Sequence, residues 1–368
     1  MTRLRGMTWD HPRGIDPLRA HAAFWRQARG VEVEWDARPL ADFEAYPLTD
    51  LAERYDLIVI DHPHVGAAAA TGCLLALESC GCGVELSAMT DATVGRSFES
   101  YFYDGRQWAL AIDAAAQVAA RRADAGFDWP ADWQEVLSLA AGGRVACPLA
   151  PVHALMSFYS RCANLGHPCA VGDRFAEPDV GGQALTELRA LAARVDPRCL
   201  RATPIDVLEW MSGENSTVAY APLVYGYVSY ARDGFRACRI EFADMQGVAG
   251  STLGGTGVAV SARLAWRDAA LAVAFDLASP DTQRGLYAGA GQPAHRAAWL
   301  SAEVNAPVHG FYANTLQTLE ATYTRPRFDG YIAFQAAAGR IVVECLNRSL
   351  STQSAVAQMN DLFRRSLP

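Results

Sequence analysis

The sequence predicts an α/β protein that is folded into two lobes. The chain has 368 residues, which is beyond the size at which a single hydrophobic core usually keeps growing. Near the N-terminus, short apolar runs alternate with segments of helical periodicity, the rhythm of βαβ units. The sequence shows no internal repeat, no low-complexity tract and no long linker, so we expect short crossings between the lobes.

The first elements can be assigned in order. Residues 5–9 predict a short strand. Asp16 and Pro17 then predict a helix start, because aspartate caps helices and proline fits the first helical position. We expect that helix to end at Gly30. Its helical spacing comes from Leu18, Ala22, Trp25 and Ala28.

Two strands follow this helix. The alternating segment VEVEW at 31–35 predicts a half-buried strand. The fully apolar run LIVI at 57–60 predicts a buried parallel strand. The N-terminal region therefore predicts a sheet that is at least partly parallel.

The later part of the chain is rich in helical patterns. Asp132 and Glu135 have the spacing of a capping box, which predicts a helix start. The stretch 181–195 predicts an amphipathic helix. A further helix should end at Pro280, with one buried face formed by Trp266, Ala270, Val273 and Leu277.

Composition excludes several functions. All 32 basic residues are arginine, so the chain has neither a Schiff-base lysine for pyridoxal chemistry nor a P-loop lysine. The net charge of −8 gives no support to a nucleic-acid partner. No apolar stretch is long enough to span a membrane. We expect no cofactor.

The nine cysteines contain no CxxC pair, which argues against zinc-knuckle and thioredoxin-like sites. We expect reduced thiols, with Cys73, Cys80 and Cys82 in the core. The N-terminus has no apolar leader behind its basic residues. The sequence as it stands therefore predicts a cytoplasmic location, and a periplasmic one is the alternative if a leader was removed.

The triplet Asp-His-Pro occurs twice, at 10–12 and at 61–63, each time after an apolar run. In parallel sheets, ligands bind beyond the carboxyl ends of strands. We therefore expect the two loops to lie at the same edge of a sheet. The proline should hold each preceding histidine in an extended conformation, so the two loops should share a shape.

Five segments resemble motifs of one known family, in the same order along the chain. YDGRQWALAIDAAAQV is similar to a Y-x-G-K-x-Y-G-L-P stretch, and DWPADWQEVLSLA to a P-x-T-W-x-E-L helix start. VLEWMSGENSTVAY resembles F-x-x-G-x-A-A-M. GGTGVAVSARLAWRDAALAVAFDLASPDTQ resembles a G-G-x-x-x-x-I-S block that continues to S-P-E-x-Q, and TRPRFDGYIAFQ resembles an R-P-x-x-x-x-Y tail. The family is that of the extracellular, maltose-binding-protein-like solute-binding proteins that serve ABC importers.

The resemblance implies a periplasmic-binding-protein-like fold, in which two α/β lobes joined by a hinge close on a ligand. Lobe one would comprise residues 1–112 and 258–306, and lobe two residues 113–257 and 307–368. It also implies ligand contacts from the ends of strands and from the crossings. These candidates are Trp9, Asp10, His11, Asp61, His62, His64, Asp113, Gln117, Tyr220, Tyr225, Tyr227, Gly255, Thr256 and Gln292.

Aromatic faces with carboxylates and amides at their edges suit a sugar, whose ring stacks and whose hydroxyls form hydrogen bonds. We expect Trp9 to be a stacking platform, and the alternative is that it packs in lobe one. The tyrosines could equally be core residues. Asp10 and Asp61 could merely cap helices.

Two other ligand classes remain open at this point. A small organic acid could be held by arginine, with Arg13 as the nearest candidate. A metal ion such as ferric iron could be held by tyrosines or by His11, His62 and His64 together with the two aspartates. However, the sequence has no dedicated ligand spacing, so we predict no metal.

Catalysis is the third alternative. Paired carboxylates could hydrolyse a glycoside, but the chain has no GxSxG motif and no dinucleotide-binding glycine fingerprint. We therefore predict a non-enzymatic, monomeric solute-binding protein for a carbohydrate. An ABC permease is a further candidate partner.

Overall fold

The computed structural model describes residues 2–245, 247 and 250–368, and for residues 41, 44 and 45 it describes the backbone only. The chain divides into two compact units. Unit 1 comprises Met1–Ala115, Gly254–Ala306 and Arg327–Asp329, and unit 2 comprises Ala116–Leu253, Pro307–Pro326 and Gly330–Pro368. The sequence predicts three crossings between the lobes, after residues 112, 257 and 306. It did not anticipate the short return of the chain to unit 1 at 327–329.

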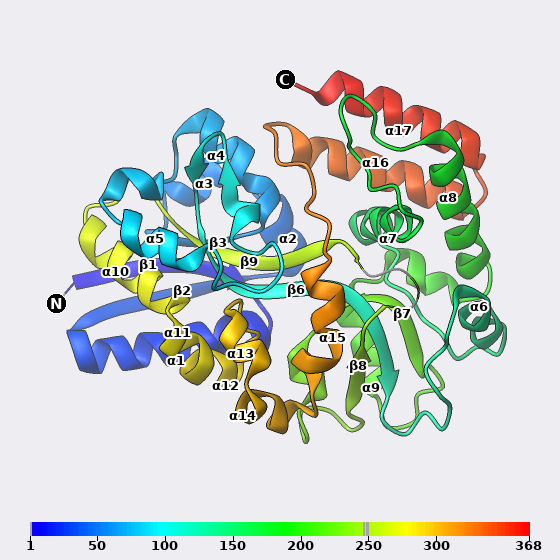
Figure 1. The fold of residues 1–368 in the computed structure, drawn as a ribbon, viewed down its shortest axis with the longest axis horizontal. Helices are drawn as coiled ribbons and strands as arrows, with labels where there is room; N and C mark the ends of the chain where they lie inside the picture. Colours follow the sequence, from blue (N-terminus) through cyan, green and yellow to red (C-terminus); the bar gives the residue numbers. More distant parts are fainter. Residues whose placement is uncertain (1, 246, 248–249) are drawn as a thin grey trace. The chain divides into compact units, whose positions relative to one another are not determined.

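The sheet of unit 1 is built around β1, as Figure 1 shows. Strand β1 (Thr2–Trp9) pairs in parallel with β2 (Val31–Arg38) on one side and with β3 (Leu57–Ile60) on the other. Strand β9 (Leu253–Val260) pairs with β3 in the antiparallel direction. The predicted parallel strands are present, and the antiparallel strand comes from a distant part of the chain.

Helices and short turns of helix complete unit 1. They are α1 (Pro12–Arg29), α2 (Leu40–Ala45), α3 (Leu48–Ala52), η1 (His62–His64), α4 (Val65–Thr71), η2 (Leu77–Cys80), α5 (Gly83–Met89), η3 (Glu99–Tyr101), α10 (Arg267–Ala278), α11 (Pro280–Thr282), η6 (Gln283–Tyr287), α12 (Ala288–Ala290), α13 (Arg296–Leu300) and α14 (Ala302–Asn305). A small hairpin consists of β4 (Phe102–Tyr103) and β5 (Arg106–Gln107).

The sheet of unit 2 is antiparallel. Its central strand is β6 (Leu110–Arg122), which begins in unit 1 and pairs with β7 (Tyr220–Tyr225) and with β8 (Ile240–Ala243). The helices of unit 2 are α6 (Trp133–Ala141), α7 (Pro151–Asn164), α8 (Pro178–Ala192), η4 (Pro197–Arg201), α9 (Pro204–Ser212), η5 (Val228–Ala231), α15 (Phe311–Glu320), α16 (Tyr331–Leu346) and α17 (Thr352–Ser366). The turn η7 (Ala306–Val308) lies at a unit boundary.

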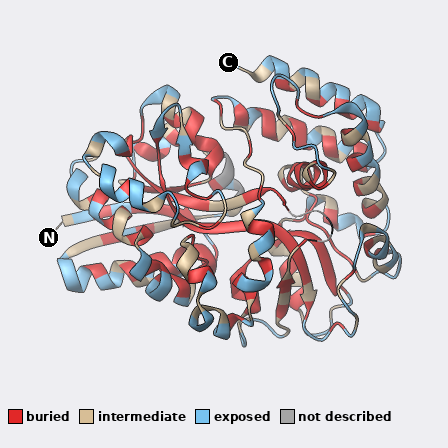
Figure 2. Cartoon of the chain, in the orientation of Figure 1, coloured by how far each residue is buried: buried red, intermediate tan, exposed pale blue. Residues whose placement is uncertain are grey.

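The core of each unit lies on its strands. Figure 2 colours most strand residues as buried, and all four residues of β3 are buried. Strand β6 is buried along nearly its whole length, because its small alanine side chains allow neighbouring elements to approach closely. No helix among the described residues is both long enough and apolar enough to cross a membrane.

The first helix starts earlier than the sequence predicted. Helix α1 begins at Pro12, so Pro17 lies inside it. The cap is His11 rather than Asp16, because the Nδ1 atom of His11 accepts a hydrogen bond from the backbone N–H of Arg13 at 3.1 Å. Pro17 is the sixth residue of the helix, so it removes the hydrogen bond that a backbone N–H there would donate to the carbonyl of Arg13. The predicted end at Gly30 is confirmed by its left-handed φ of 66°.

The later helices agree better with the sequence. Asp132 caps α6 by accepting from the backbone N–H of Glu135 at 2.9 Å. Helix α8 occupies most of the predicted amphipathic stretch. In α10, however, the predicted buried face is only partly confirmed, because Trp266 precedes the helix and is 55% exposed. The other three residues of that face are buried.

Candidate ligand-binding site

The two Asp-His-Pro triplets stand side by side in unit 1. Strand β1 pairs with β3 so that Gly6 faces Leu57, and the same sequence offset separates Asp10 from Asp61. Each aspartate directly follows the last residue of its strand. The expectation that both triplets lie at the carboxyl ends of neighbouring parallel strands is therefore confirmed. This edge of the sheet is where ligands bind in open α/β folds.

The first triplet leads straight into α1. Asp10 is exposed, and its backbone N–H donates to the carbonyl of Arg38 at 2.7 Å, which extends the pairing of β1 with β2. His11 is buried and extended, with φ −155° and ψ 145°. Because its Nδ1 atom caps α1, the His11 ring stabilises the start of this helix.

The second triplet has a different backbone shape. Asp61 is the extended residue, while His62 already lies inside η1. The prediction that each proline holds its preceding histidine extended is thus wrong for His62. Its buried ring meets the ring of Tyr101 edge-on, with 6.4 Å between centroids. His64 is also buried, at the end of the same turn.

Tyr101 was not predicted from the sequence, although it supports this edge of the sheet. Its hydroxyl donates to the carbonyl of Ile60 at 3.2 Å. A Cβ atom on Gly257 would lie 2.8 Å from the tyrosine ring, so glycine is needed there to admit the ring. No signal in the sequence links residue 101 to residue 257, because their contact depends on the chain's tertiary path.

The third strand adds a hydroxyl group. The register of β3 with β9 pairs Ile60 with Gly257, and continuing it by one residue places Thr256 opposite Asp61. Thr256 is buried, and its hydroxyl forms no hydrogen bond with the described residues. A buried hydroxyl without a partner is costly, which makes Thr256 a good candidate for contact with a ligand.

The close approach of β9 to β6 depends on Gly255. Its φ is 92°, a conformation that other residues rarely adopt, and a Cβ atom there would lie 2.3 Å from the carbonyl oxygen of Asp113. Gly255 is half-buried. Its task in the structure is to let the two backbones pass.

Arg13 and Asp113 form a buried ion pair within unit 1. The Nε atom of Arg13 donates to Oδ2 of Asp113 at 2.9 Å, and a second N–H donates to Oδ1. Burial raises the pKa of Asp113, the Arg13 guanidinium acts in the opposite direction, and the nearby Asp61 carboxylate raises that pKa further. The interaction with Asp61 indicates that this pair lies close to the edge that carries the two triplets.

This ion pair bears on two expectations about ligand contacts. Asp113 was a candidate ligand contact, but its side chain is fully buried and already serves Arg13. Arg13 was the nearest candidate for holding an organic acid, and its charge is balanced by Asp113. An arginine that is already paired with a carboxylate offers little attraction to a second anion.

Trp9 is a core residue rather than an exposed stacking platform. It is 3% exposed. Its ring packs against Phe43, with 5.5 Å between centroids. A Cβ atom on Gly14 would lie 2.5 Å from the indole, so helix α1 presses directly on this ring. The alternative stated above, packing in lobe one, is the one that the structure supports.

Gln292 and Gln117 are also used internally. Gln292 is buried, and its amide donates to the carbonyl of Ala114 at 2.6 Å. In unit 2, the Gln117 amide donates to the Ser157 hydroxyl at 3.2 Å, and its oxygen accepts from the Ser160 hydroxyl at 2.6 Å. Both side chains therefore fix strand β6 to its neighbours.

The three candidate tyrosines of unit 2 differ. Tyr220 is fully buried at the start of β7, against the rings of Phe127 and Trp129, so it is a core residue. Tyr225 ends the strand and is half-buried, whereas Tyr227 is buried just beyond it. These last two remain candidates for a ligand contact.

The histidines and aspartates were considered above as ligands of a metal ion. Among the described residues, no group of three histidine, cysteine, aspartate or glutamate side chains is placed to hold a metal ion. His11 serves as a helix cap and His62 packs on a tyrosine. The alternative in which these residues converge on ferric iron therefore has no geometric support.

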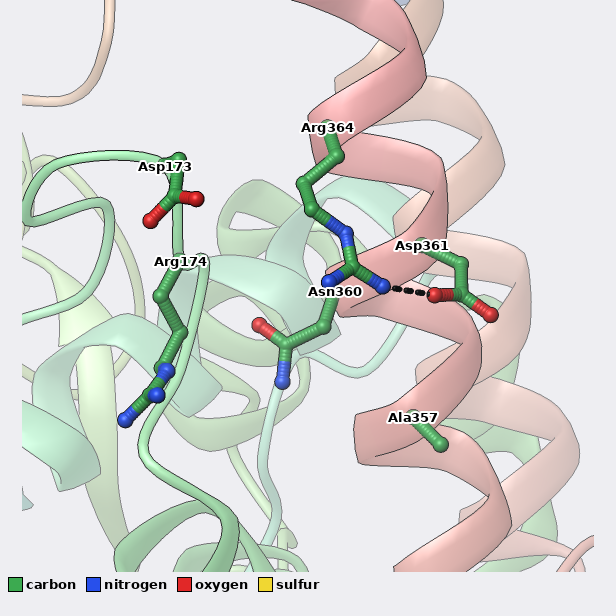
Figure 3. Close-up of a pocket in the computed structure, with 6 residues that line it drawn as sticks. All are labelled: Asp173, Arg174, Ala357, Asn360, Asp361 and Arg364. Atoms are coloured by element: carbon green, nitrogen blue, oxygen red, sulfur yellow. Dashed lines mark hydrogen bonds and ion pairs between the residues drawn. The ribbon is translucent and has the colours of Figure 1, made fainter.

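A pocket of about 270 Å³ lies in unit 2 beside α17 (Figure 3). Two of its arginines form ion pairs with nearby carboxylates, Arg364 with Asp361 and Arg174 with Glu177. The Oδ1 atom of Asn360 accepts hydrogen bonds from the backbone N–H groups of Phe175 and Ala176, each at 2.9 Å. Asn360 thereby attaches the loop before α8 to helix α17.

The sequence matches no family model and no curated protein. Its fold, in contrast, is shared by solved structures over the whole chain. T. maritima MalE3 bound to maltose is 17% identical, with a TM-score of 0.83 and 100% of both chains covered. A solute-binding protein of an ABC transporter from Agrobacterium radiobacter K84, in complex with ribitol, is 19% identical, with a TM-score of 0.83 over 100% of this chain and 99% of that chain.

The Thermus thermophilus maltotriose-binding protein gives a similar result, with 17% identity, a TM-score of 0.79 and 100% of both chains covered. At such low identity, the similarity establishes the fold. The predicted α/β, periplasmic-binding-protein-like fold is therefore confirmed, and the resemblance to maltose-binding-protein-like proteins holds at the level of the fold.

Proposed function

We propose that this protein captures a small, uncharged polar ligand, a carbohydrate, without transforming it chemically. The observation that carries the proposal is the alignment of Asp10 and Asp61 at the ends of neighbouring parallel strands, next to the buried Thr256 hydroxyl. These groups come from three adjacent strands. They present hydrogen-bond acceptors and one hydroxyl along a single edge of the sheet.

The chemistry of this edge favours hydroxyl groups as partners. An ionised carboxylate only accepts hydrogen bonds, and it accepts them strongly from O–H groups. Sugars and polyols offer several such donors at fixed spacing. Anions are disfavoured because the guanidinium of Arg13 is paired with Asp113. Solved structures with the same fold include proteins bound to maltose, ribitol, tagatose and mannitol.

For unit 2 by itself, we further propose that Tyr225 and Tyr227 form an aromatic surface suited to a sugar ring. The two residues lie at and just after the end of β7, separated by Gly226. A Cβ atom on Gly226 would lie 3.0 Å from the Phe311 ring, so Gly226 faces Phe311. This supports an arrangement in which the two tyrosine rings point away from Phe311. Aromatic rings pack well on the apolar faces of sugars.

The proposed role is that of the substrate-binding component of an ABC-type importer, or of a relative that shares its binding chemistry. Strands β6 and β9 each belong partly to unit 1 and partly to unit 2. We therefore expect ligand binding to be coupled to a rearrangement of the units about these strands. Small-angle scattering with and without ligand would measure it, and light scattering would test the expected monomer.

A thermal-shift screen over sugars, polyols, organic acids and ferric iron tests the function. A ligand that binds only the folded protein raises its melting temperature in a concentration-dependent way. We expect a sugar or polyol to raise it. Asp61→Asn should weaken this response, and Asp173→Asn is a matched control because Asp173 lies in the pocket beside α17. A response to organic acids or iron alone, or steady turnover of a glycoside, would contradict the proposal.

A further inference from the structure

Two cysteines lie on the surface of unit 1, against the expectation that they belong to the core. Cys80 ends η2, and Cys82 precedes α5. Both are half-buried, as is Cys238 in unit 2. The remaining cysteines are buried, namely Cys73, Cys147, Cys162, Cys169, Cys199 and Cys345. Because cysteine reactivity requires access as well as charge, the Cys80–Cys82 pair stands apart from the buried thiols.

Cys80 faces a guanidinium group. The Nη2 atom of Arg267, the first residue of α10, lies 3.1 Å from the Sγ atom of Cys80 and 3.5 Å from the carbonyl oxygen of Ser79. The guanidinium places a positive charge directly beside this sulfur, and the charge around a cysteine is one of the factors that set its reactivity. The contact therefore prepares Cys80 for reaction with an electrophile.

Cys82 is placed as the second partner. Gly81 has a left-handed backbone with φ 76°, and this turn directs the Cys82 sulfur back to the carbonyl oxygen of Cys80, at 3.6 Å. Burial raises the pKa of Cys82, Glu85 and Cys80 raise it further, and Arg267 acts in the opposite direction. Added Cβ atoms on Gly81 and Gly83 would meet no heavy atom within 4 Å, which leaves the turn open to small reagents.

We propose that Cys80 and Cys82 form a reversible redox site, in which hydrogen peroxide oxidises Cys80 and Cys82 then closes a disulfide. In the first step the Cys80 thiolate attacks a peroxide oxygen, the O–O bond breaks, and the leaving hydroxide takes a proton to become water. Cys80 loses two electrons and becomes a sulfenic acid. In the second step the Cys82 sulfur attacks the Cys80 sulfur, the S–O bond breaks, and water leaves with the Cys82 proton.

The spacing of the two residues permits this bond. A disulfide needs α-carbons within about 4.4–6.8 Å of each other, a separation that residues two apart reach when the residue between them makes a tight turn such as that at Gly81. In the disulfide, the sulfur atom of Cys80 carries no negative charge opposite Arg267, while the contact of Arg267 with the Ser79 carbonyl does not involve the sulfur. A dithiol such as dithiothreitol reverses the reaction by exchange.

Cys238 provides an internal comparison. It is half-buried like Cys80, but its sulfur faces the Asp124 carboxylate at 3.5 Å. Burial raises the pKa of Cys238, Arg122 lowers it, and Asp124 raises it. We therefore expect Cys238 to react more slowly with peroxide than Cys80.

The test is mass spectrometry of the whole protein after exposure to hydrogen peroxide and alkylation. Cleavage after Glu78 and Glu85 releases a peptide that contains Cys80 and Cys82 and no other cysteine. We expect this peptide to lose two hydrogens and to resist alkylation until it is reduced. In Cys82→Ser, dimedone should trap the sulfenic acid on Cys80.

Arg267→Gln should slow the oxidation of Cys80 severalfold, and Arg267→Lys should restore most of the rate because it keeps the positive charge. The Cys238 peptide from the same samples reports general oxidation. The proposal fails if Cys238 is oxidised first while the Cys80–Cys82 peptide stays a dithiol. It also fails if Arg267→Gln leaves the Cys80 rate unchanged.

Discussion

Arg13 and Asp113 are joined by two hydrogen bonds, one of them 2.9 Å from Nε to Oδ2, although they lie 100 positions apart in the sequence. The pair connects the first turn of α1 to strand β6. Both side chains are almost completely buried. A buried ion pair is stabilising only as a unit, because removing one partner leaves the other charge without compensation in the interior.

Removing Asp113 should therefore be costly. We expect Asp113→Ala to lower the free energy of unfolding by about 3–5 kcal/mol, measured by urea denaturation. The double variant Arg13→Met with Asp113→Leu should recover much of this loss, since it leaves no buried charge. Asp361→Asn, which breaks the exposed pair with Arg364, is the control and should change stability by about 1 kcal/mol or less. Equal losses in Asp113→Ala and Asp361→Asn would contradict this view.

Asp10 and Asp61 should act on binding rather than on folding. We expect Asp61→Asn to weaken affinity for the ligand found in the thermal-shift screen by about tenfold, which corresponds to about 1.4 kcal/mol, and Asp10→Asn to act in the same direction. Each substitution keeps the shape of the side chain and removes its charge, so the melting temperature without ligand should hardly move. Isothermal titration calorimetry measures the affinity. Unchanged affinity in both variants would exclude this edge as the binding site.

Trp9→Ala should act in the opposite way. The ring is buried between Gly14 and Phe43, so its loss should lower the free energy of unfolding by about 3–5 kcal/mol. Protein that remains folded should bind ligand with nearly wild-type affinity. Phe24→Ala is a suitable control, because Phe24 is exposed on α1 and its loss should cost little stability. A stable Trp9→Ala variant with impaired binding would restore the stacking interpretation.

His153 should make unit 2 sensitive to acid. Burial and the neighbouring Arg325 guanidinium lower the pKa of His153 to about 4, with Asp206 opposing them. Because the unfolded chain takes up a proton near pH 6.5 and the folded protein only near pH 4, stability is complete above pH 6.5 and declines between these values. The expected loss is about 3 kcal/mol at most.

His153→Asn should flatten this pH dependence, since asparagine does not titrate. The measurement is the urea midpoint at several pH values between 7 and 4.5. The same substitution at the exposed His167 is the control and should leave the pH profile as it is in the wild type. If the two variants have the same profile, His153 is not responsible for acid sensitivity.

Local features of the fold could be predicted from the sequence, and long-range ones could not. The strand at Leu57–Ile60 and the cap at Asp132 were correct because an apolar run and a capping residue are complete signals within a few residues. The start of α1 was placed too late, since Asp16-Pro17 is a stronger local signal than a histidine cap at His11.

The candidate site shows the same division. The position of the two Asp-His-Pro triplets followed from the strands that precede them. The roles of Trp9 and Asp113 did not, because each depends on partners in other elements, Phe43 for the one and Arg13 for the other. Such partners decide whether a polar or aromatic side chain is buried. The residues that neighbour this side chain in the sequence do not reveal which partners it will have.

The pairing of β3 with β9 also determines when this protein can finish folding as it is synthesised. Leu57 pairs with Val260, so this pairing cannot form until Val260 has been synthesised. At ribosomal rates of roughly 5–20 residues per second, Val260 is added roughly 10–40 s after Leu57. During this interval the apolar residues of β3 lack one of their two neighbouring strands. A nascent chain with such an exposed edge is a natural client for chaperones, and translation speed between these two segments should affect the yield of native protein.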